Sequence, residues 1–139
     1  MNVPTIAKAV LVNEHGEVLL LRRSQTDTRR PGQWDFPGGN VDADEDIRAA
    51  VIRETAEEAG IDLKHPVVVY GYSEPRLPWG FPTWIVFAEK VSGQPAVRLS
   101  EEHDQSTWMP LADAVEAFEY PLHRQTLSYL LDNKILDAL

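Results

Sequence analysis

Three glutamates within one stretch of helix-forming sequence, Glu54, Glu57 and Glu58, are the side chains best suited to chemistry. On a helix, residues three and four apart share a face, so the three carboxylates are expected to point the same way. Anions this close repel each other unless water or a multivalent cation lies between them. Carboxylate oxygens are the ligands that Mg²⁺ and Mn²⁺ prefer, and Mg²⁺ usually binds a substrate phosphate as well. The cluster alone is a weak signal, because glutamate-rich helix faces are commonly just solvated.

The opposite side of the same helix is predicted to be apolar. Ala49, Ile52, Ala56 and Ala59 form a stripe when the residues are spaced 100° apart. Three of these four residues are alanines, which would allow the helix to sit close to a sheet. We therefore expect a helix buried on one side, with its carboxylates displayed on the other.

The stretch around this helix resembles the Nudix box, G-x5-E-x7-R-E-U-x-E-E-x-G-U, where U is a bulky aliphatic residue. The matching residues, with every spacing kept, are Gly39, Glu45, Arg53, Glu54, Glu57, Glu58, Gly60 and Ile61. Thr55 at the first U position is the one departure, and it is β-branched and close to the expected size. Family-like features on both sides extend the resemblance over nearly the whole chain.

The resemblance implies a fold, a reaction and a cofactor. The fold would be α/β, a Nudix-type α/β/α sandwich with a mixed β-sheet, formed by residues 1–139 as a single domain. The reaction would be hydrolysis of a nucleoside diphosphate linked to another moiety, with Mg²⁺ or Mn²⁺ as cofactor and no covalent nucleophile. The implied metal ligands on and before the helix are Glu54, Glu57, Glu58 and the backbone carbonyl of Gly38.

A further acidic residue is expected from the segment before Trp108. Some family members carry a metal ligand or base six residues before this tryptophan, which corresponds to Glu102 here. Glu101 and Asp104 are close alternatives in the same acidic loop. Glu102 is also one of three candidates for the base that activates water.

The other two candidates for the base are Glu57 and Glu58 on the box helix, and the sequence does not choose among the three. Arg53 lies about 100° round the helix from Glu54. We therefore interpret Arg53 as a residue that positions the glutamates.

Candidates for substrate binding lie outside the box. Arg22 and Arg23 end a predicted strand, and adjacent strand residues point to opposite faces, so at most one of them should face the site. Arg23 resembles family residues that contact substrate phosphate; a solvated strand end is the alternative. Trp79 and Phe81 could stack on a nucleobase, unless they pack their loop onto the body of the protein.

The expected substrate is a ribo- or deoxyribonucleoside triphosphate, cleaved to a monophosphate and pyrophosphate. His123 is assigned to substrate binding, because a bacterial family member that clears oxidised dGTP has a base-reading asparagine fifteen residues after the position of Trp108. An imidazole lacks the paired donor and acceptor of an amide, which argues against oxidised guanine. ADP-ribose, dinucleoside polyphosphates and a non-catalytic nucleotide-binding module are the alternatives. The intact box glutamates favour an enzyme.

Composition limits the possible partners. The chain of 139 residues has no cysteine, which excludes disulfides and thiolate sites, and its net charge of −9 argues against a nucleic-acid polymer as partner. No signal peptide or apolar run of about 20 residues is evident, so we expect a cytoplasmic protein without membrane contact. A monomer or a homodimer is expected. Bound divalent cations would reconcile the negative charge with a polyphosphate substrate.

Strands are predicted for residues 5–12, 17–23, 66–72 and 83–91, with a turn at 14–16 and a polar loop at 24–33. The second strand is almost continuously apolar, which predicts burial on both faces. Asp42 or Asp44 is expected to cap the box helix, with Glu45 in its first turn and Gly60 closing it. Helices are predicted for 111–118 and 122–136.

Overall fold

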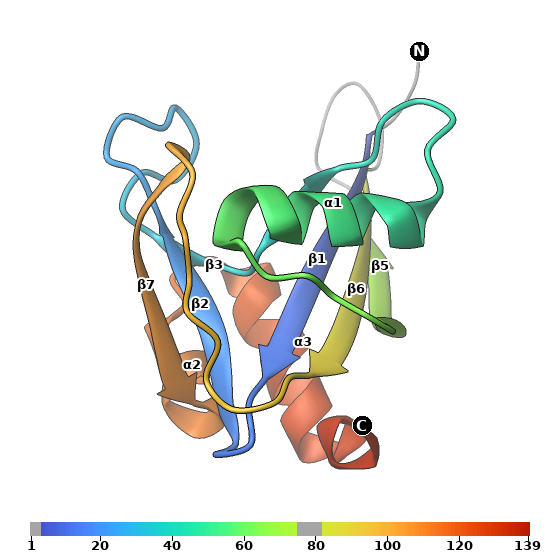
Figure 1. Ribbon diagram of the computed structural model, residues 1–139, viewed down its shortest axis with the longest axis vertical. Helices are drawn as coiled ribbons and strands as arrows, with labels where there is room; N and C mark the ends of the chain where they lie inside the picture. Colours follow the sequence, from blue (N-terminus) through green and yellow to red (C-terminus); the bar gives the residue numbers. More distant parts are fainter. Residues whose placement is uncertain (1–3, 75–81) are drawn as a thin grey trace.

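The computed structural model describes residues 4–74 and 82–139 (Figure 1). Within this part of the chain, a mixed sheet of seven strands is combined with three α-helices and one short 3-10 helix. The elements are β1 (Thr5–Val12), β2 (Glu17–Arg23), β3 (Trp34–Asp35), β4 (Gly38–Asn40), α1 (Ile47–Ala59), β5 (Val67–Ser73), β6 (Thr83–Lys90), β7 (His103–Pro110), α2 (Leu111–Ala117), α3 (Pro121–Asp132) and η1 (Ile135–Ala138). No helix in the described ranges is long and apolar enough to cross a membrane.

The sheet is mixed because β1 runs parallel to β6 and antiparallel to β2 and β4. The strand order is β3-β2-β1-β6-β5, with β4 also paired to β1 and β7 paired to β2. β1 and β2 share only the register pair Val12↔Val18, next to their turn. Beyond this pair, β2 is hydrogen-bonded to β7, while the first half of β1 is hydrogen-bonded to β4. The two halves of the sheet therefore diverge, as Figure 1 shows.

Helices cover both faces of the sheet, with α1 on one face and α2 and α3 on the other (Figure 1). Successive strand residues point to opposite faces, so β1 and β2 contribute to two separate cores. The core under α1 contains Ala7, Ala9, Leu11, Leu19, Leu21, Val51, Ala59 and Phe87. The core under α2 and α3 contains Val10, Val18, Leu20, Phe36, Phe118, Leu127 and Leu130. The predicted sandwich and the two-sided burial of the second strand are confirmed.

The start of α1 differs from the prediction. Asp46 is the N-cap, and its side chain accepts a hydrogen bond from the Ala49 backbone N–H at 3.0 Å. The predicted caps, Asp42 and Asp44, lie before this turn, and Glu45 precedes the helix instead of entering its first turn. Several acidic residues in a row can each serve as a cap, so composition alone did not identify the one whose backbone geometry fits.

The buried face of α1 also differs from the predicted stripe. Its buried residues are Ala50, Val51, Thr55, Glu58 and Ala59. Ala49, expected in the stripe, is exposed. The buried face is therefore rotated so that a glutamate enters it, which a pattern based on apolar residues does not anticipate.

The remaining boundaries lie close to the predictions. Gly60 ends α1 with φ of 69°, and its backbone N–H reaches the Ala56 carbonyl, as expected of a C-cap. The last predicted helix is shorter, because α3 ends at Asp132 and Lys134 adopts φ of 54° before η1. The two-residue and three-residue strands β3 and β4 were not predicted, since such short strands show no periodic pattern.

Candidate active site

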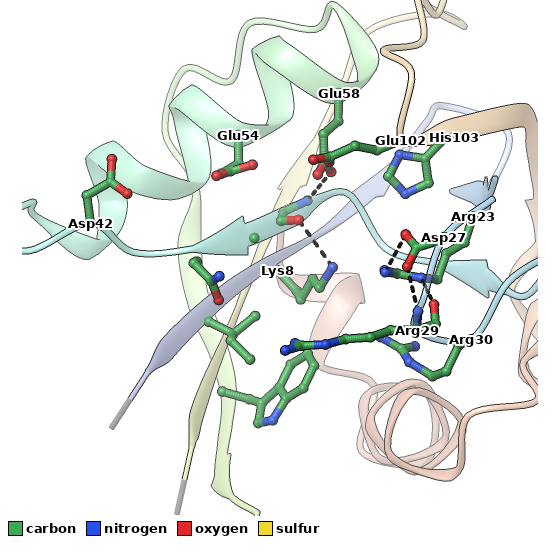
Figure 2. Close-up of a pocket in the computed structure, with 15 residues that line it drawn as sticks. Lys8, Arg23, Asp27, Arg29, Arg30, Asp42, Glu54, Glu58, Glu102 and His103 are labelled. Atoms are coloured by element: carbon green, nitrogen blue, oxygen red, sulfur yellow. Dashed lines mark hydrogen bonds and ion pairs between the residues drawn. The ribbon is translucent and has the colours of Figure 1, made fainter. Parts of the chain in front are cut away.

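A cavity of about 410 Å³ opens where the two halves of the sheet diverge, beneath α1 (Figure 2). Strands β1, β2, β4 and β6, helix α1, the start of β7 and the loop between β2 and β3 all contribute to its lining. Its lining has an acidic wall of Asp42, Glu54, Glu58 and Glu102 and a basic wall of Lys8, Arg23, Arg29 and Arg30. Asp27, which also lines the cavity, forms an ion pair with Arg23 within the basic wall. Such a cavity suits a small polyanion together with cations, because the acidic wall attracts the cations and the basic wall attracts the polyanion.

Glu58 is the most deeply buried member of the acidic wall, with 4% of its surface exposed. Its Oε1 accepts a hydrogen bond from the Gly38 backbone N–H at 2.9 Å. Burial above all, together with a hydrogen bond with Glu102, raises the pKa of Glu58 to about 8, against the opposing effects of the Lys8 charge and the Gly38 hydrogen bond. Without a cation, this carboxyl group holds a proton at neutral pH.

Glu58 belongs to a cluster with Glu102 and His103. One potential ligand atom from each of the three side chains lies within 4.8 Å of the others. Of the two alternatives to Glu102, Asp104 forms an ion pair with Arg22 at 2.8 Å. Neither Asp104 nor the other alternative, Glu101, lines the cavity. The cluster contains oxygen and nitrogen donors of the kind that bind divalent cations.

His103 was not anticipated as a site residue. Its side chain points toward Glu58 and Glu102 in Figure 2. Within the described part of the chain, neither its Nδ1 nor its Nε2 has a hydrogen-bond partner. Burial lowers its pKa, opposed in part by the charge of Asp35. The sequence signal that could have identified it is its position directly after the predicted ligand Glu102.

The three box glutamates do not share one orientation. Glu54 lines the cavity with Glu58, four residues away, but the Glu57 side chain is 58% exposed and does not line it. Arg53 donates to Glu54 at 3.1 Å and lies 3.3 Å from Glu57. It also donates to Glu45 at 2.8 Å. These contacts are what a residue that positions glutamates would make.

Gly38, whose carbonyl was predicted as a metal ligand, lines the cavity, and this carbonyl accepts a hydrogen bond from Lys8 Nζ at 3.2 Å. The same amine contacts the Phe36 carbonyl and Asp35 Oδ2, each at 3.2 Å. Lys8 is 5% exposed and was not anticipated, although a single lysine within the apolar strand is a recognisable signal. A buried lysine needs partners of this kind.

Asp35 is a second unanticipated residue, fully buried beneath the basic wall. Its Oδ2 lies 2.9 Å from Arg23 Nη1, and its Oδ1 lies 2.7 Å from His123 Nε2. Burial alone would raise the pKa of Asp35, but Lys8, His123 and Arg30 hold it well below the usual range. Asp35 is therefore an anion to which several cationic side chains are anchored.

Arg23 lines the cavity, whereas Arg22 points away from it, as strand alternation predicts. The Arg23 guanidinium is engaged by protein groups, since it donates to the Arg29 carbonyl at 2.7 Å, to Asp27 at 2.7 Å and to Asp35 at 2.9 Å. The Arg29 side chain extends across the cavity in Figure 2. Arg23 therefore organises the loop that presents Arg29.

His123 does not reach the cavity. It is 1% exposed, and its ring packs edge-on against Phe36, Trp84, Phe118 and Tyr120. The expectation that His123 binds substrate is therefore not supported, because α3 turns this side chain into the core. Trp79 and Phe81, the predicted stacking residues, lie outside the described residues.

Comparison with known proteins gives a consistent set of matches. Residues 3–130 match the model of the NUDIX domain. An 8-oxo-dGTP diphosphatase from Escherichia coli is 30% identical over 84% of this chain and 86% of its own length. An asymmetrical bis(5'-nucleosyl)-tetraphosphatase from Caenorhabditis elegans is 33% identical over 75% of each chain. Among solved structures, a MutT protein from Methanosarcina mazei has a TM-score of 0.80 and 31% identity, covering 96% of this chain and 97% of its own.

Proposed function

The chain belongs to the Nudix family, and from this premise we propose that it hydrolyses a ribo- or deoxyribonucleoside triphosphate to a monophosphate and pyrophosphate, using Mg²⁺ or Mn²⁺. As a member of this family it is a hydrolase of phosphorus-containing anhydrides. The observation that carries the proposal is the pairing of an acidic and a basic wall across one cavity. The E. coli relative, named for a nucleoside triphosphate, supports that substrate class.

The acidic wall supplies the candidate metal ligands. Glu58, Glu102 and the Gly38 carbonyl border one part of the cavity, with Glu54 beside them. Bound divalent ions would neutralise phosphate charge and lower the pKa of an attacking water molecule. We assign the proton acceptor to Glu58 or Glu102, because both face the cavity and Glu57 does not. Arg53 holds Glu54 in place and makes no contact with substrate in this assignment.

The basic wall supplies the phosphate contact. Arg29 reaches into the cavity, and its side chain makes no ion pair within residues 4–74 and 82–139. We assign it the contact with a substrate phosphate, with Arg23 holding the loop behind it. Arg29→Gln should raise KM by roughly 10- to 100-fold, because a charge-assisted hydrogen bond contributes about 1.5–3 kcal/mol. Arg22→Gln, at the end of β2 and outside the cavity lining, is the control.

A dinucleoside polyphosphate is the second candidate substrate. A C. elegans Ap4A hydrolase structure covers 99% of this chain with a TM-score of 0.79 and 27% identity. Such a substrate would place a second nucleoside beyond the phosphates. Oxidised guanine nucleotides stay among the candidates as well, because His123 does not line the cavity and so does not argue against them.

A hydrolysis screen with Mg²⁺ or Mn²⁺ tests the proposal. It would compare canonical and oxidised nucleoside triphosphates, dinucleoside polyphosphates, ADP-ribose and nucleotide sugars, with products resolved by chromatography. We expect a triphosphate to be cleaved to a monophosphate and pyrophosphate. Preference for a dinucleoside polyphosphate would support the second candidate. Nucleotide binding without turnover of any compound would contradict both and indicate a binding module.

A further inference from the structure

His103 has a buried imidazole ring whose nitrogens are left without hydrogen bonds among the described residues. It is 5% exposed and faces the cavity. Buried polar groups are nearly always paired, because an unpaired donor or acceptor costs about 1–3 kcal/mol. Two carboxylates, Glu58 and Glu102, lie directly beside this ring. The three side chains together form a set of donors suited to a divalent cation.

The way β7 pairs with β2 explains why this ring faces the carboxylates. The register shifts between Arg22 and Arg23, so that Gln105 is opposite Arg22 and His103 is opposite Arg23. Asp104 is the extra residue of this irregularity, and directly opposed residues of antiparallel strands lie on the same face. His103 therefore shares the cavity face with Arg23. Bulges commonly redirect side chains next to active sites in this manner.

We propose that His103 is a metal ligand, completing with Glu58 and Glu102 a site with one nitrogen and two oxygen donors that favours Mn²⁺ over Mg²⁺. This inference rests on the proposed function, since it specifies the ion used at the same cavity. Ligand atoms bound to one ion lie at most about 4.2 Å apart when each metal bond is about 2.1 Å. The ligand atoms of the three side chains already lie within 4.8 Å of one another, so small side-chain rotations would bring them to this distance.

The choice of donors determines the choice of ion. Mg²⁺ prefers oxygen ligands, whereas imidazole is a good ligand for first-row transition ions. A site of carboxylates alone would take Mg²⁺ or Mn²⁺ with little distinction. A buried imidazole whose ring nitrogens have no hydrogen-bond partner among the described residues adds selectivity for Mn²⁺. Replacing His103 should therefore reduce the affinity for Mn²⁺ more than that for Mg²⁺.

Pulsed electron paramagnetic resonance on the Mn²⁺-loaded protein tests this without measuring activity. We expect a hyperfine coupling from a histidine nitrogen, which changes when the wild-type protein is prepared with ¹⁵N-histidine. The coupling should be absent in His103→Gln and intact in His15→Gln, an exposed control. Mn²⁺ affinity in His103→Gln should fall at least about tenfold, with a smaller change for Mg²⁺ measured by competition.

Each outcome decides the inference. A wild-type spectrum without nitrogen coupling, or one that His103→Gln leaves unchanged, would overturn it. The ¹⁵N-labelled wild-type protein keeps the test valid should His103→Gln not fold. Nitrogen coupling without any nucleotide hydrolysis would support the metal site and refute the proposed function. Hydrolysis without nitrogen coupling would do the reverse.

Discussion

At the scale of single residues, Glu58 belongs both to the buried core and to the candidate active site. It lies on the buried face of α1 and accepts a hydrogen bond from the Gly38 backbone, yet its carboxyl group also borders the cavity. Water is largely excluded there, so the ionised form is stabilised only by specific partners. A cation bound beside Glu58 would therefore contribute to folding as well as to catalysis.

Glu58→Gln should lower turnover by roughly 10²–10⁴-fold while the fold persists, because an amide cannot act as a base or as an anionic ligand. The amide oxygen can still accept the Gly38 hydrogen bond, so circular dichroism and the thermal midpoint should change little. Glu116→Gln, an exposed position on α2, should retain full activity. Loss of structure in Glu58→Gln would show that the charge itself is needed for folding.

The raised pKa of Glu58 predicts how stability depends on pH without metal. The pKa of this carboxyl group is about 4.5 in the unfolded chain and about 8 in the folded protein. Between these values the folded state binds more protons at Glu58, so the stability that this group contributes is fully present below about pH 4.5 and declines as the pH rises toward 8. The slope should not exceed about 1.4 kcal/mol per pH unit for this one group.

Urea unfolding at several pH values, in the presence of a chelator, measures this dependence. Glu58→Gln should remove most of the decline, since an amide does not titrate in this range. Added Mn²⁺ should also flatten the profile in the wild-type protein, because an ion beside the carboxylate favours its charged form. An equal decline in Glu58→Gln would assign the effect to other groups.

At the scale of elements, strand β4 brings the box helix and the sheet close together. Gly38 has φ of 131°, and a Cβ there would lie 2.1 Å from the Ala7 carbonyl oxygen. The three atoms nearest to a Cβ on Gly39 would all belong to the Glu54 carboxylate, with Oε2 at 2.8 Å. The two adjacent glycines are therefore required for different reasons. A side chain on Gly38 would clash with the backbone of β1, whereas a side chain on Gly39 would displace the Glu54 carboxylate.

Gly38→Ala and Gly39→Ala should separate these reasons. Gly38→Ala should destabilise the protein by about 2–5 kcal/mol, from backbone strain and a clash with β1. Gly39→Ala should melt near the wild-type temperature but lose roughly 10²-fold in activity, because the Glu54 carboxylate is displaced. Gly93→Ala, at positive φ with no neighbouring atom within 4 Å, is the control for strain alone. Equal melting of the two variants and the wild type would refute the assignment.

At the scale of the whole molecule, Asp35 connects elements that are distant in sequence. It contacts Lys8 from β1, Arg23 from β2 and His123 from α3. The basic wall and the core beneath α3 therefore share one buried anion. Since none of these four residues is fully solvated, removing the anion leaves buried positive charge uncompensated.

Asp35→Asn should therefore reduce stability by about 3–5 kcal/mol, measured by urea unfolding. Adding Lys8→Met should cost less than the two single changes combined, because one of the unpaired cations is then absent. Asp62→Asn, at an exposed position, is the control. Additive effects in the double variant would show that Lys8 and Asp35 do not interact energetically.

The sequence by itself determined the family, the mixed α/β fold and the cluster of carboxylates on α1, because these depend on local spacing. Four-residue periodicity placed Glu54 and Glu58 together, and strand alternation separated Arg22 from Arg23. The counted position of Glu102 also lies at the cavity. Each of these features depends on residues close together in the chain, where helix and strand geometry is nearly invariant.

Only the tertiary structure decided which distant residues face one another across the cavity. Lys8 and His103 line the cavity from two different strands, and Asp35 lies buried behind Lys8 on a third. A register shift in β7 turns His103 inward, which no local pattern reveals. The direction of α3 placed His123 in the core, although its sequence position suggested the site. Burial arises from the packing of the whole chain, so the charge state of Glu58 and the unpaired ring of His103 could not be predicted from their neighbours in sequence.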